Sequence, residues 1–227
     1  MTDKYDVLLV GCFGYPNLGD ELILRAWLNS IFEYDRELKI LVDCHRPSLA
    51  LSICGDYGEK VTYQDCLWQI VWNAPDSPAE SFLWGKNFLT EELSDIFSQR
   101  FLLSRFENIK LIILCGGGYI RKYWNKHYSL LGIIHSIKKL LDIPVVMTGQ
   151  GFIPFDCDTS SFIFSILNDF EYVSVRDRWS YEKVKEVSTV FHGSYIDDTF
   201  LFRNSPLGKN YIPVSDEKKY QILVSFF

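Results

Sequence analysis

The feature that most constrains the fold is a junction that occurs three times, in which an apolar strand runs into a glycine-rich loop. The junctions lie at residues 10–21, 111–119 and 145–151. Glycine lets the backbone approach a ligand closely, and a helix that follows such a loop offers unpaired N–H groups. Three junctions of this kind predict a ligand crevice at the carboxyl edge of one parallel sheet.

Strand patterns alternate with helix patterns along the chain, which is typical of an α/β domain. We expect a Rossmann-like, doubly wound, mostly parallel sheet in which the first strand lies beside the strand at 110–115. The loops at 11–19 and 116–118 would then face each other. Expected strands are 5–11, 38–42, 61–63, 110–115, 144–148, 171–175 and 189–192; helices are expected from Asp20, within 64–108 apart from a break at 73–78, and at 126–141, 159–169 and 179–187.

Composition narrows the function classes. The chain has 227 residues, 48% of them hydrophobic, and a net charge of −6. An acidic protein is a poor partner for nucleic acid, whose phosphates require a basic surface. No apolar run approaches the ~18 residues of a membrane span, and residues 1–6 do not resemble a signal peptide. We expect no nucleic-acid partner, no membrane span and a cytoplasmic location.

The six cysteines, at positions 12, 44, 54, 66, 115 and 157, form no C-x-x-C pair. The four histidines do not cluster with them, so the spacing predicts no zinc site. The pair Asp197-Asp198 could suggest a divalent metal, but two adjacent acids in a loop are usually solvated, and we expect no metal. Free, largely buried thiols are the expected state in a protein of this size without a secretion signal. The tryptophans Trp68, Trp72 and Trp84 are expected to pack in the core.

The end of the chain suggests a domain boundary. Residues 1–202 read as one Rossmann-like lobe, and residues 203–219 are polar, contain Pro206, Gly208 and Pro213, and read as a linker. Residues 220–227 then start another apolar strand. This strand is either the first of a second lobe or an edge strand of the first sheet, and the pattern favours neither.

Four motifs together resemble the polysaccharide pyruvyl transferase family. Gly14-Tyr15-Pro16-Asn17-Leu18-Gly19-Asp20-Glu21 is similar to the family's opening G-x-x-N-x-G-D-E loop. The others are Cys115-Gly116-Gly117-Gly118, residues 144–154 (P-V-x-x-x-G-Q-G-x-x-P) and residues 173–180 (V-x-V-R-D-x-x-S). Asp198-Thr199-Phe200 stands where the family has an Asp-Pro-x-Phe turn, so the proline is missing. The likeness covers nearly the whole chain.

The resemblance implies a fold of two Rossmann-like lobes, similar to glycosyltransferase B, of which this chain would supply the first. It also implies transfer of a pyruvyl group from phosphoenolpyruvate, the donor substrate, to a sugar of a polysaccharide or cell-wall glycan precursor. No cofactor is implied. A lipid-linked acceptor would bring the protein to a membrane surface without a membrane span. One lobe alone is expected to be inactive.

Candidate substrate-binding residues come from the motifs. With the family resemblance, we expect Asn17, Gly19 and Asp20 to bind acceptor hydroxyls; without it, capping of the helix would suffice. Three successive glycines, Gly116-Gly117-Gly118, exceed what a turn needs and suggest a close ligand whose anionic group meets bare N–H groups.

Two further candidates stand at later strand ends. Gln150 either binds a sugar or pins its loop. Arg176 ends a strand, and its planar guanidinium suits the carboxylate or phosphate of phosphoenolpyruvate; the alternative is an ion pair with Asp177 or Glu171. Asp177 is expected to cap the next helix.

A general base has to accept a proton from the sugar hydroxyl. His192 and Asp198 are the candidates, and the sequence does not separate them. Two other functions stay open: a lobe of a nucleotide-sugar glycosyltransferase, or a module that binds a glycan or a partner without catalysis. A dinucleotide site is least expected, since Gly11-Cys12-Phe13-Gly14 does not complete G-x-G-x-x-G.

Overall fold

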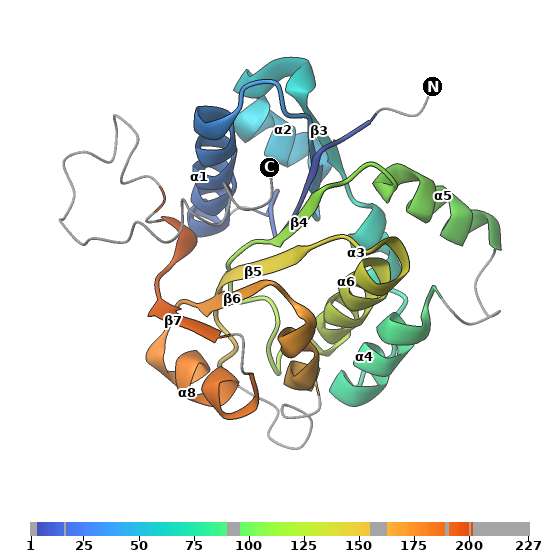
Figure 1. Cartoon of the computed structure of the whole chain (residues 1–227), viewed down its shortest axis with the longest axis vertical. Helices are drawn as coiled ribbons and strands as arrows, with labels where there is room; N and C mark the ends of the chain where they lie inside the picture. The colour runs from blue at the N-terminus through green and yellow to red at the C-terminus, as the bar shows by residue number, and fades with distance from the viewer. Residues whose placement is uncertain are drawn as a thin grey trace.

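The computed structural model describes residues 4–15, 17–89, 96–154, 163–188, 191–199 and 201, with the backbone alone for 96–100 and 191–194. The predicted linker at 203–219 and the predicted strand at 220–227 lie outside the described residues. The described residues form a layered α/β fold around one twisted sheet (Figure 1). Among its helices, none is both long and apolar enough to cross a membrane.

The sheet has seven strands in the order β3-β2-β1-β4-β5-β6-β7, and every neighbouring pair is parallel. This order confirms the Rossmann-like, doubly wound sheet and places β1 beside β4, as the sequence predicts. The strands are β1 (Val7–Val10), β2 (Ile40–Asp43), β3 (Val61–Gln64), β4 (Leu111–Leu114), β5 (Val145–Gln150), β6 (Tyr172–Val175) and β7 (Phe191–Tyr195).

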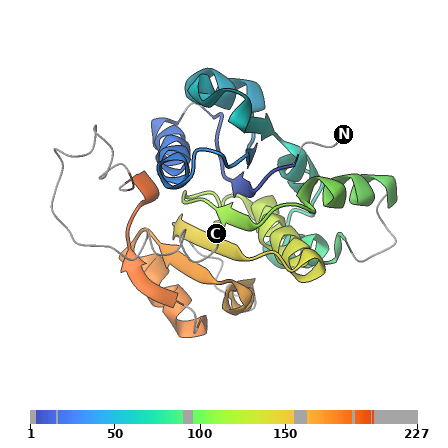
Figure 2. The same cartoon turned by 45° about the horizontal axis from the view of Figure 1, so that its top comes forward.

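Helices cover both faces of the sheet, and their arrangement is clearest in Figure 2. The α-helices are α1 (Leu18–Tyr34), α2 (Pro47–Cys54), α3 (Cys66–Val71), α4 (Pro78–Asn87), α5 (Ile96–Phe106), α6 (Tyr128–Leu141) and α8 (Arg178–Val187). Short 3-10 helices lie at η1 (Gly55–Lys60), η2 (Asn125–His127) and η3 (Ser165–Asp169).

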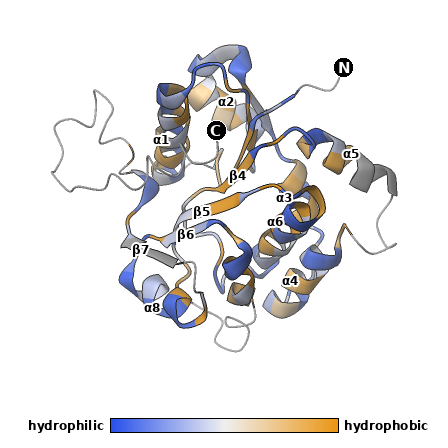
Figure 3. Ribbon diagram, viewed as in Figure 1, coloured by the Kyte–Doolittle hydropathy of each residue, from blue (hydrophilic) through white to orange (hydrophobic). Residues whose placement is uncertain are grey.

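Each face of the sheet has its own core, because successive side chains of a strand point to opposite faces. Val7 and Leu9 of β1 pack with α1 and α2, whereas Leu8 and Val10 pack with the helices on the other face. Strands buried on both faces are rich in apolar residues: β4 is apolar throughout and the first half of β5 is apolar, as the hydropathy colouring shows (Figure 3).

The structure corrects three details of the sequence prediction. Residues 47–54 form α2, for which no helix was predicted. Within the predicted helix at 159–169, the described part contains the 3-10 helix η3. Trp68 is buried and Trp84 packs partly buried against the core, but Trp72 is 44% exposed and lines a cavity.

Candidate functional site

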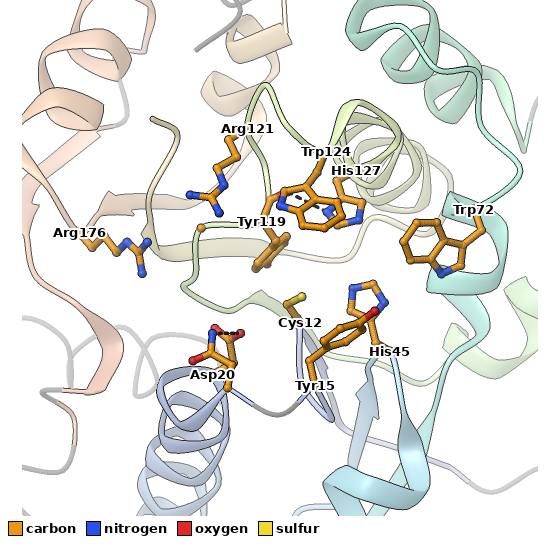
Figure 4. Close-up of a pocket in the computed structure, with 12 residues that line it drawn as sticks. Cys12, Tyr15, Asp20, His45, Trp72, Tyr119, Arg121, Trp124, His127 and Arg176 are labelled. Carbon is orange, nitrogen blue, oxygen red and sulfur yellow. Dashed lines mark hydrogen bonds between the residues drawn. The ribbon is translucent and has the colours of Figure 1, made fainter. Parts of the chain in front are cut away.

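A cavity of about 240 Å³ opens at the carboxyl ends of β1 and β4, where the winding of the sheet reverses. Open α/β sheets bind ligands at this switch point, in pockets of about 300–1,000 Å³. The cavity has two ends (Figure 4): a charged end, where charged side chains gather, and an aromatic end, where aromatic rings gather. The lining residues are Cys12, Tyr15, Asn17, Asp20, His45, Trp72, Gly118, Tyr119, Arg121, Trp124, His127 and Arg176.

At the charged end, the start of α1 presents Asn17 and Asp20. Asn17 is the N-cap: its side-chain oxygen accepts a hydrogen bond from the Gly19 amide at 3.1 Å. Its amide nitrogen donates to Asp20 Oδ2 at 2.7 Å. Burial raises the pKa of Asp20 above its usual value, although Asn17 and Arg176 act against the increase. The cap therefore holds a carboxylate of increased basicity at the cavity wall. Gly19 itself does not line the cavity.

Two arginines converge on the same end, Arg176 after β6 and Arg121 in the loop after β4 (Figure 4). Arg176 makes neither ion pair considered from the sequence; its Nη1 lies 3.7 Å from Asp197 Oδ2. Glu171 pairs with Lys138 instead. Arg121 forms no ion pair with any residue that the structure describes, and its Nε is buried without a partner. Two guanidinium groups facing a cavity form a site for an anion with several oxygens.

At the aromatic end, two histidines lie among rings. His45 stacks on Trp68 with centroids 3.8 Å apart and meets Tyr15 edge-on at 5.5 Å. His127 lies parallel to Trp124 at 5.5 Å. Burial lowers the pKa of each histidine to about 4, so both rings are neutral near pH 7.

The tautomer of His127 follows from its contacts. Its Nδ1 lies 2.8 Å from the carbonyl oxygen of Tyr119, which can only accept, so Nδ1 carries the proton. Cys12 lies between the two ends of the cavity (Figure 4). Burial, together with Asp20 and Glu21, raises the pKa of the Cys12 thiol to about 12 and keeps it protonated. The described residues contain no group of three or more potential metal ligands.

A side chain is disfavoured at each of the three glycines, Gly116, Gly117 and Gly118, for a different geometric reason. A Cβ on Gly116 would lie 2.8 Å from the carbonyl oxygen of Gly149, and Gly117 has a φ of +154°. The amides of Gly116 and Gly117 donate to Asp198 and Gly149, which corrects the prediction that these N–H groups are bare. Of the three, only Gly118 lines the cavity. A Cβ there would lie 2.7 Å from Arg176 Nη2.

Gln150 pins the loop after β4. Its side-chain amide donates to the carbonyl of Cys115 and, at 3.0 Å, to the hydroxyl oxygen of Tyr119. The Tyr119 hydroxyl in turn donates to the Cys115 carbonyl at 2.8 Å. Gln150 is fully buried and does not line the cavity, so these contacts match the loop-pinning alternative.

Of the two candidate bases, the structure describes the side chain of Asp198 alone, and Asp198 does not line the cavity. Asp198 is fully buried, and its Oδ2 accepts hydrogen bonds from Trp27 Nε1, the Gly116 amide and Thr148 Oγ1 at 2.9, 2.9 and 2.6 Å. His192 falls inside β7, and its side chain is outside the described part. Asp177 caps α8, as predicted, by accepting from the Ser180 amide at 2.8 Å.

Of the residues predicted from the sequence, the structure brings Asn17, Asp20, Gly118 and Arg176 to one cavity. The remaining lining residues were not predicted: Cys12, Tyr15, His45, Trp72, Tyr119, Arg121, Trp124 and His127. One signal was available, because His45 is a polar residue just after β2, where side chains reach the carboxyl edge of the sheet.

Comparison with known proteins gives one match. A family model described as polysaccharide pyruvyl transferase matches residues 17–221. Searches of curated proteins and of solved structures returned no significant match. The matched region includes every charged residue of the cavity.

Proposed function

Since the chain belongs to the polysaccharide pyruvyl transferase family, we propose that its cavity binds phosphoenolpyruvate between Arg121 and Arg176 and transfers the pyruvyl group to a sugar. The observation that carries the proposal is the convergence of these two guanidinium groups in a protein whose net charge is −6. Phosphoenolpyruvate offers a carboxylate and a phosphate, and each suits a planar fork of N–H donors.

The proposed chemistry forms a ketal. One sugar hydroxyl adds its oxygen to C2 of phosphoenolpyruvate while C3 gains a proton, and a second hydroxyl of the same sugar then displaces phosphate from C2. Two C–O bonds form, the bond from C2 to the phosphate oxygen breaks, and the two hydroxyl protons end on C3 and on phosphate. The arginines stabilise the charge on the departing phosphate.

Asp20 is our candidate for the group that receives the hydroxyl proton. It faces the arginines across the cavity (Figure 4), and burial raises its pKa, which makes it a stronger base than an exposed aspartate. His192 and Asp198 remain predictions from the sequence. Asp198 already accepts three hydrogen bonds on one oxygen, which leaves Asp20 the more accessible carboxylate.

The family resemblance also bears on the rest of the enzyme, on its acceptor and on its location. We propose a second, glycosyltransferase-B-like lobe as the opposite wall of the cleft, and a glycan precursor, soluble or lipid-linked, as the acceptor. The enzyme would work in the cytoplasm, where phosphoenolpyruvate is produced. Closure of two walls would exclude water and align donor with acceptor.

The rival functions are a nucleotide-sugar glycosyltransferase lobe and a glycan-binding module without catalysis. A dinucleotide site gains no support, because the acidic residue at the end of β2 is used elsewhere. Asp43 is fully buried, accepts from Gln64 Nε2 at 2.9 Å and from the Leu67 amide at 3.1 Å, and so holds the start of α3.

The test measures phosphoenolpyruvate affinity by calorimetry. It also measures ketal formation by a protein that contains the proposed second lobe. Arg176→Ala should weaken donor binding by at least tenfold, with Arg176→Lys intermediate because it keeps the charge and loses the fork. Arg178→Ala, two residues later and outside the cavity lining, is the matched control. Unchanged donor affinity in Arg176→Ala, or an equal loss in Arg178→Ala, would reject the proposed donor site.

A further inference from the structure

The aromatic end of the cavity has no part in donor binding as proposed above. We infer that Tyr15, His45 and Trp72 form the subsite for the acceptor sugar ring and determine which sugar is accepted. The inference rests on the proposed function, since it takes the arginine end as the donor site. It concerns the rings on the opposite side of Cys12 (Figure 4).

Exposure of large rings at this end requires an explanation. Tyr15 and Trp72 are each 44% exposed and Trp124 is 46% exposed, and all three line one concave surface. Exposed apolar surface gathered in a concavity marks a binding site more often than single exposed side chains do. A ligand that covers these rings would remove apolar surface from water.

The rings are held in place before any ligand arrives. Lys126 Nζ donates to the carbonyl of Trp72 at 3.0 Å, and His127 fixes the loop after β4 through the Tyr119 carbonyl. The His45 ring is held from two sides, by Trp68 and Tyr15. Little conformational entropy is then lost when a ring-shaped ligand binds.

Polar groups at this end suit a sugar. Within the described part of the chain, neither the His45 imidazole nor the Trp72 indole N–H has a hydrogen-bond partner. A neutral imidazole offers one donor and one acceptor, and an indole offers one donor. A sugar ring combines a C–H face that stacks on an aromatic ring with a rim of hydroxyls that meets such groups. The aromatic rings therefore match the C–H face of a carbohydrate, and the imidazole and indole nitrogens match its hydroxyls.

The geometry also fits the reaction. A sugar ring at Tyr15, His45 and Trp72 extends from the aromatic end toward Asp20 and the arginines, past Cys12 (Figure 4). Its reacting hydroxyls would meet Asp20, while the groups on its far side meet His45. The stereochemistry at those far positions is what the subsite would select.

The experiment measures sugar binding by saturation-transfer NMR with the methyl glycosides of glucose, galactose, mannose, N-acetylglucosamine and N-acetylmannosamine as probes. Wild-type protein should bind at least one probe in preference to the others. Trp72→Ala should weaken that binding at least tenfold. His45→Phe, which keeps the stacked ring and removes both nitrogens, should weaken it and reduce the preference among probes.

The matched control is Trp179→Ala, which removes a 72% exposed tryptophan outside the cavity lining and should leave probe binding unchanged. Failure of this inference is distinguishable from failure of the donor proposal, because Trp72→Ala should keep wild-type affinity for phosphoenolpyruvate and Arg176→Ala should keep the sugar. Binding of no probe, equal binding by Trp72→Ala and wild type, or Trp72-dependent binding of uridine monophosphate in place of the sugars would overturn it.

Discussion

The indole N–H of Trp27 in α1 donates to the carboxylate of Asp198 at 2.9 Å, across 171 residues of sequence. The same oxygen of Asp198 also binds the Gly116 amide and the Thr148 hydroxyl. One buried carboxylate thus ties α1 to the loop after β4 and to β5. The start of α1 and the loop after β4 both line the cavity, so Asp198 helps to fix its shape without lining it.

Asp198→Ala should destabilise the fold by about 3–5 kcal/mol, because it leaves buried donors without an acceptor. Trp27→Phe removes a single donor and should cost less, about 1–2 kcal/mol. Denaturant unfolding of the two variants tests this order. If Asp198 were instead the general base, Asp198→Asn would abolish transfer while its unfolding curve stayed close to that of wild type.

Two neighbouring glycines should respond differently to the same substitution. In Gly118→Ala, the new Cβ would meet the end of the flexible Arg176 side chain, which can move aside. We expect a folded protein whose phosphoenolpyruvate affinity falls about tenfold because Arg176 is displaced. In Gly116→Ala, the Cβ would meet the Gly149 backbone, which cannot move aside cheaply, so stability should fall by about 1–3 kcal/mol.

The glycine prediction is checked by thermal unfolding and calorimetry on both variants. A Gly118→Ala protein with wild-type donor affinity would show that the position of Arg176 next to this glycine does not matter. Equal destabilisation of both variants would show that the Arg176 side chain yields to the new Cβ no more easily than the Gly149 backbone does.

The neutral state of His127 predicts a pH effect on stability. Its folded pKa is lowered by burial to about 4, so between about pH 6.5 and 4 the unfolded chain binds the proton more strongly than the folded protein does. The contribution of His127 is therefore complete above pH 6.5 and falls as the pH drops, by up to about 1.4 kcal/mol per pH unit.

His127→Asn, whose side-chain amide can still donate to the Tyr119 carbonyl, should lack this slope. The measurement is the free energy of unfolding of both proteins at pH 7, 6 and 5. Asp43, whose pKa burial raises to about 7, acts in the opposite direction, but it is present in both proteins and cancels in their difference. Parallel curves from pH 7 to 5 would contradict a buried neutral His127.

The sequence predicts the sheet well where strands are buried on both faces. Leu111–Leu114 is a continuous apolar run and β5 begins with another, Val145–Met147; such runs flanked by helix patterns favour a parallel sheet. Helix α2 was missed because its periodic signal is weak. Only Ala50 and Cys54 are buried in it, while Leu51 and Ile53 face solvent.

The site was predicted where local motifs define it and missed where tertiary contacts do. Asn17 and Asp20 belong to one contiguous motif, G-x-x-N-x-G-D-E, and were predicted as binding residues from its resemblance to the family's opening loop. By contrast, Trp72 lines the cavity together with residues distant in sequence, and its backbone carbonyl accepts a hydrogen bond from Lys126, 54 residues later. Gln150 looked like a ligand-binding residue because its partners, Cys115 and Tyr119, belong to another loop. The spacing of residues in a sequence does not predict such contacts between distant segments.

Asp20 should oppose donor binding and promote the reaction, so Asp20→Asn should change the two in opposite directions. Removal of a negative charge that faces Arg176 should tighten phosphoenolpyruvate binding by about threefold or more. Transfer should fall by about 10²–10⁴, since the amide cannot accept the hydroxyl proton. The Asn17 cap can still hold the new side chain, so the fold should be retained.

Calorimetry with phosphoenolpyruvate and a ketal assay measure the two effects separately. Asp56→Asn is the matched control, because it removes the same charge from a surface ion pair with Arg25, outside the cavity lining. It should alter neither quantity. Asp20→Asn with wild-type transfer would remove Asp20 as the base, whereas weaker donor binding would mean that Asp20 positions Arg176 instead of repelling the donor.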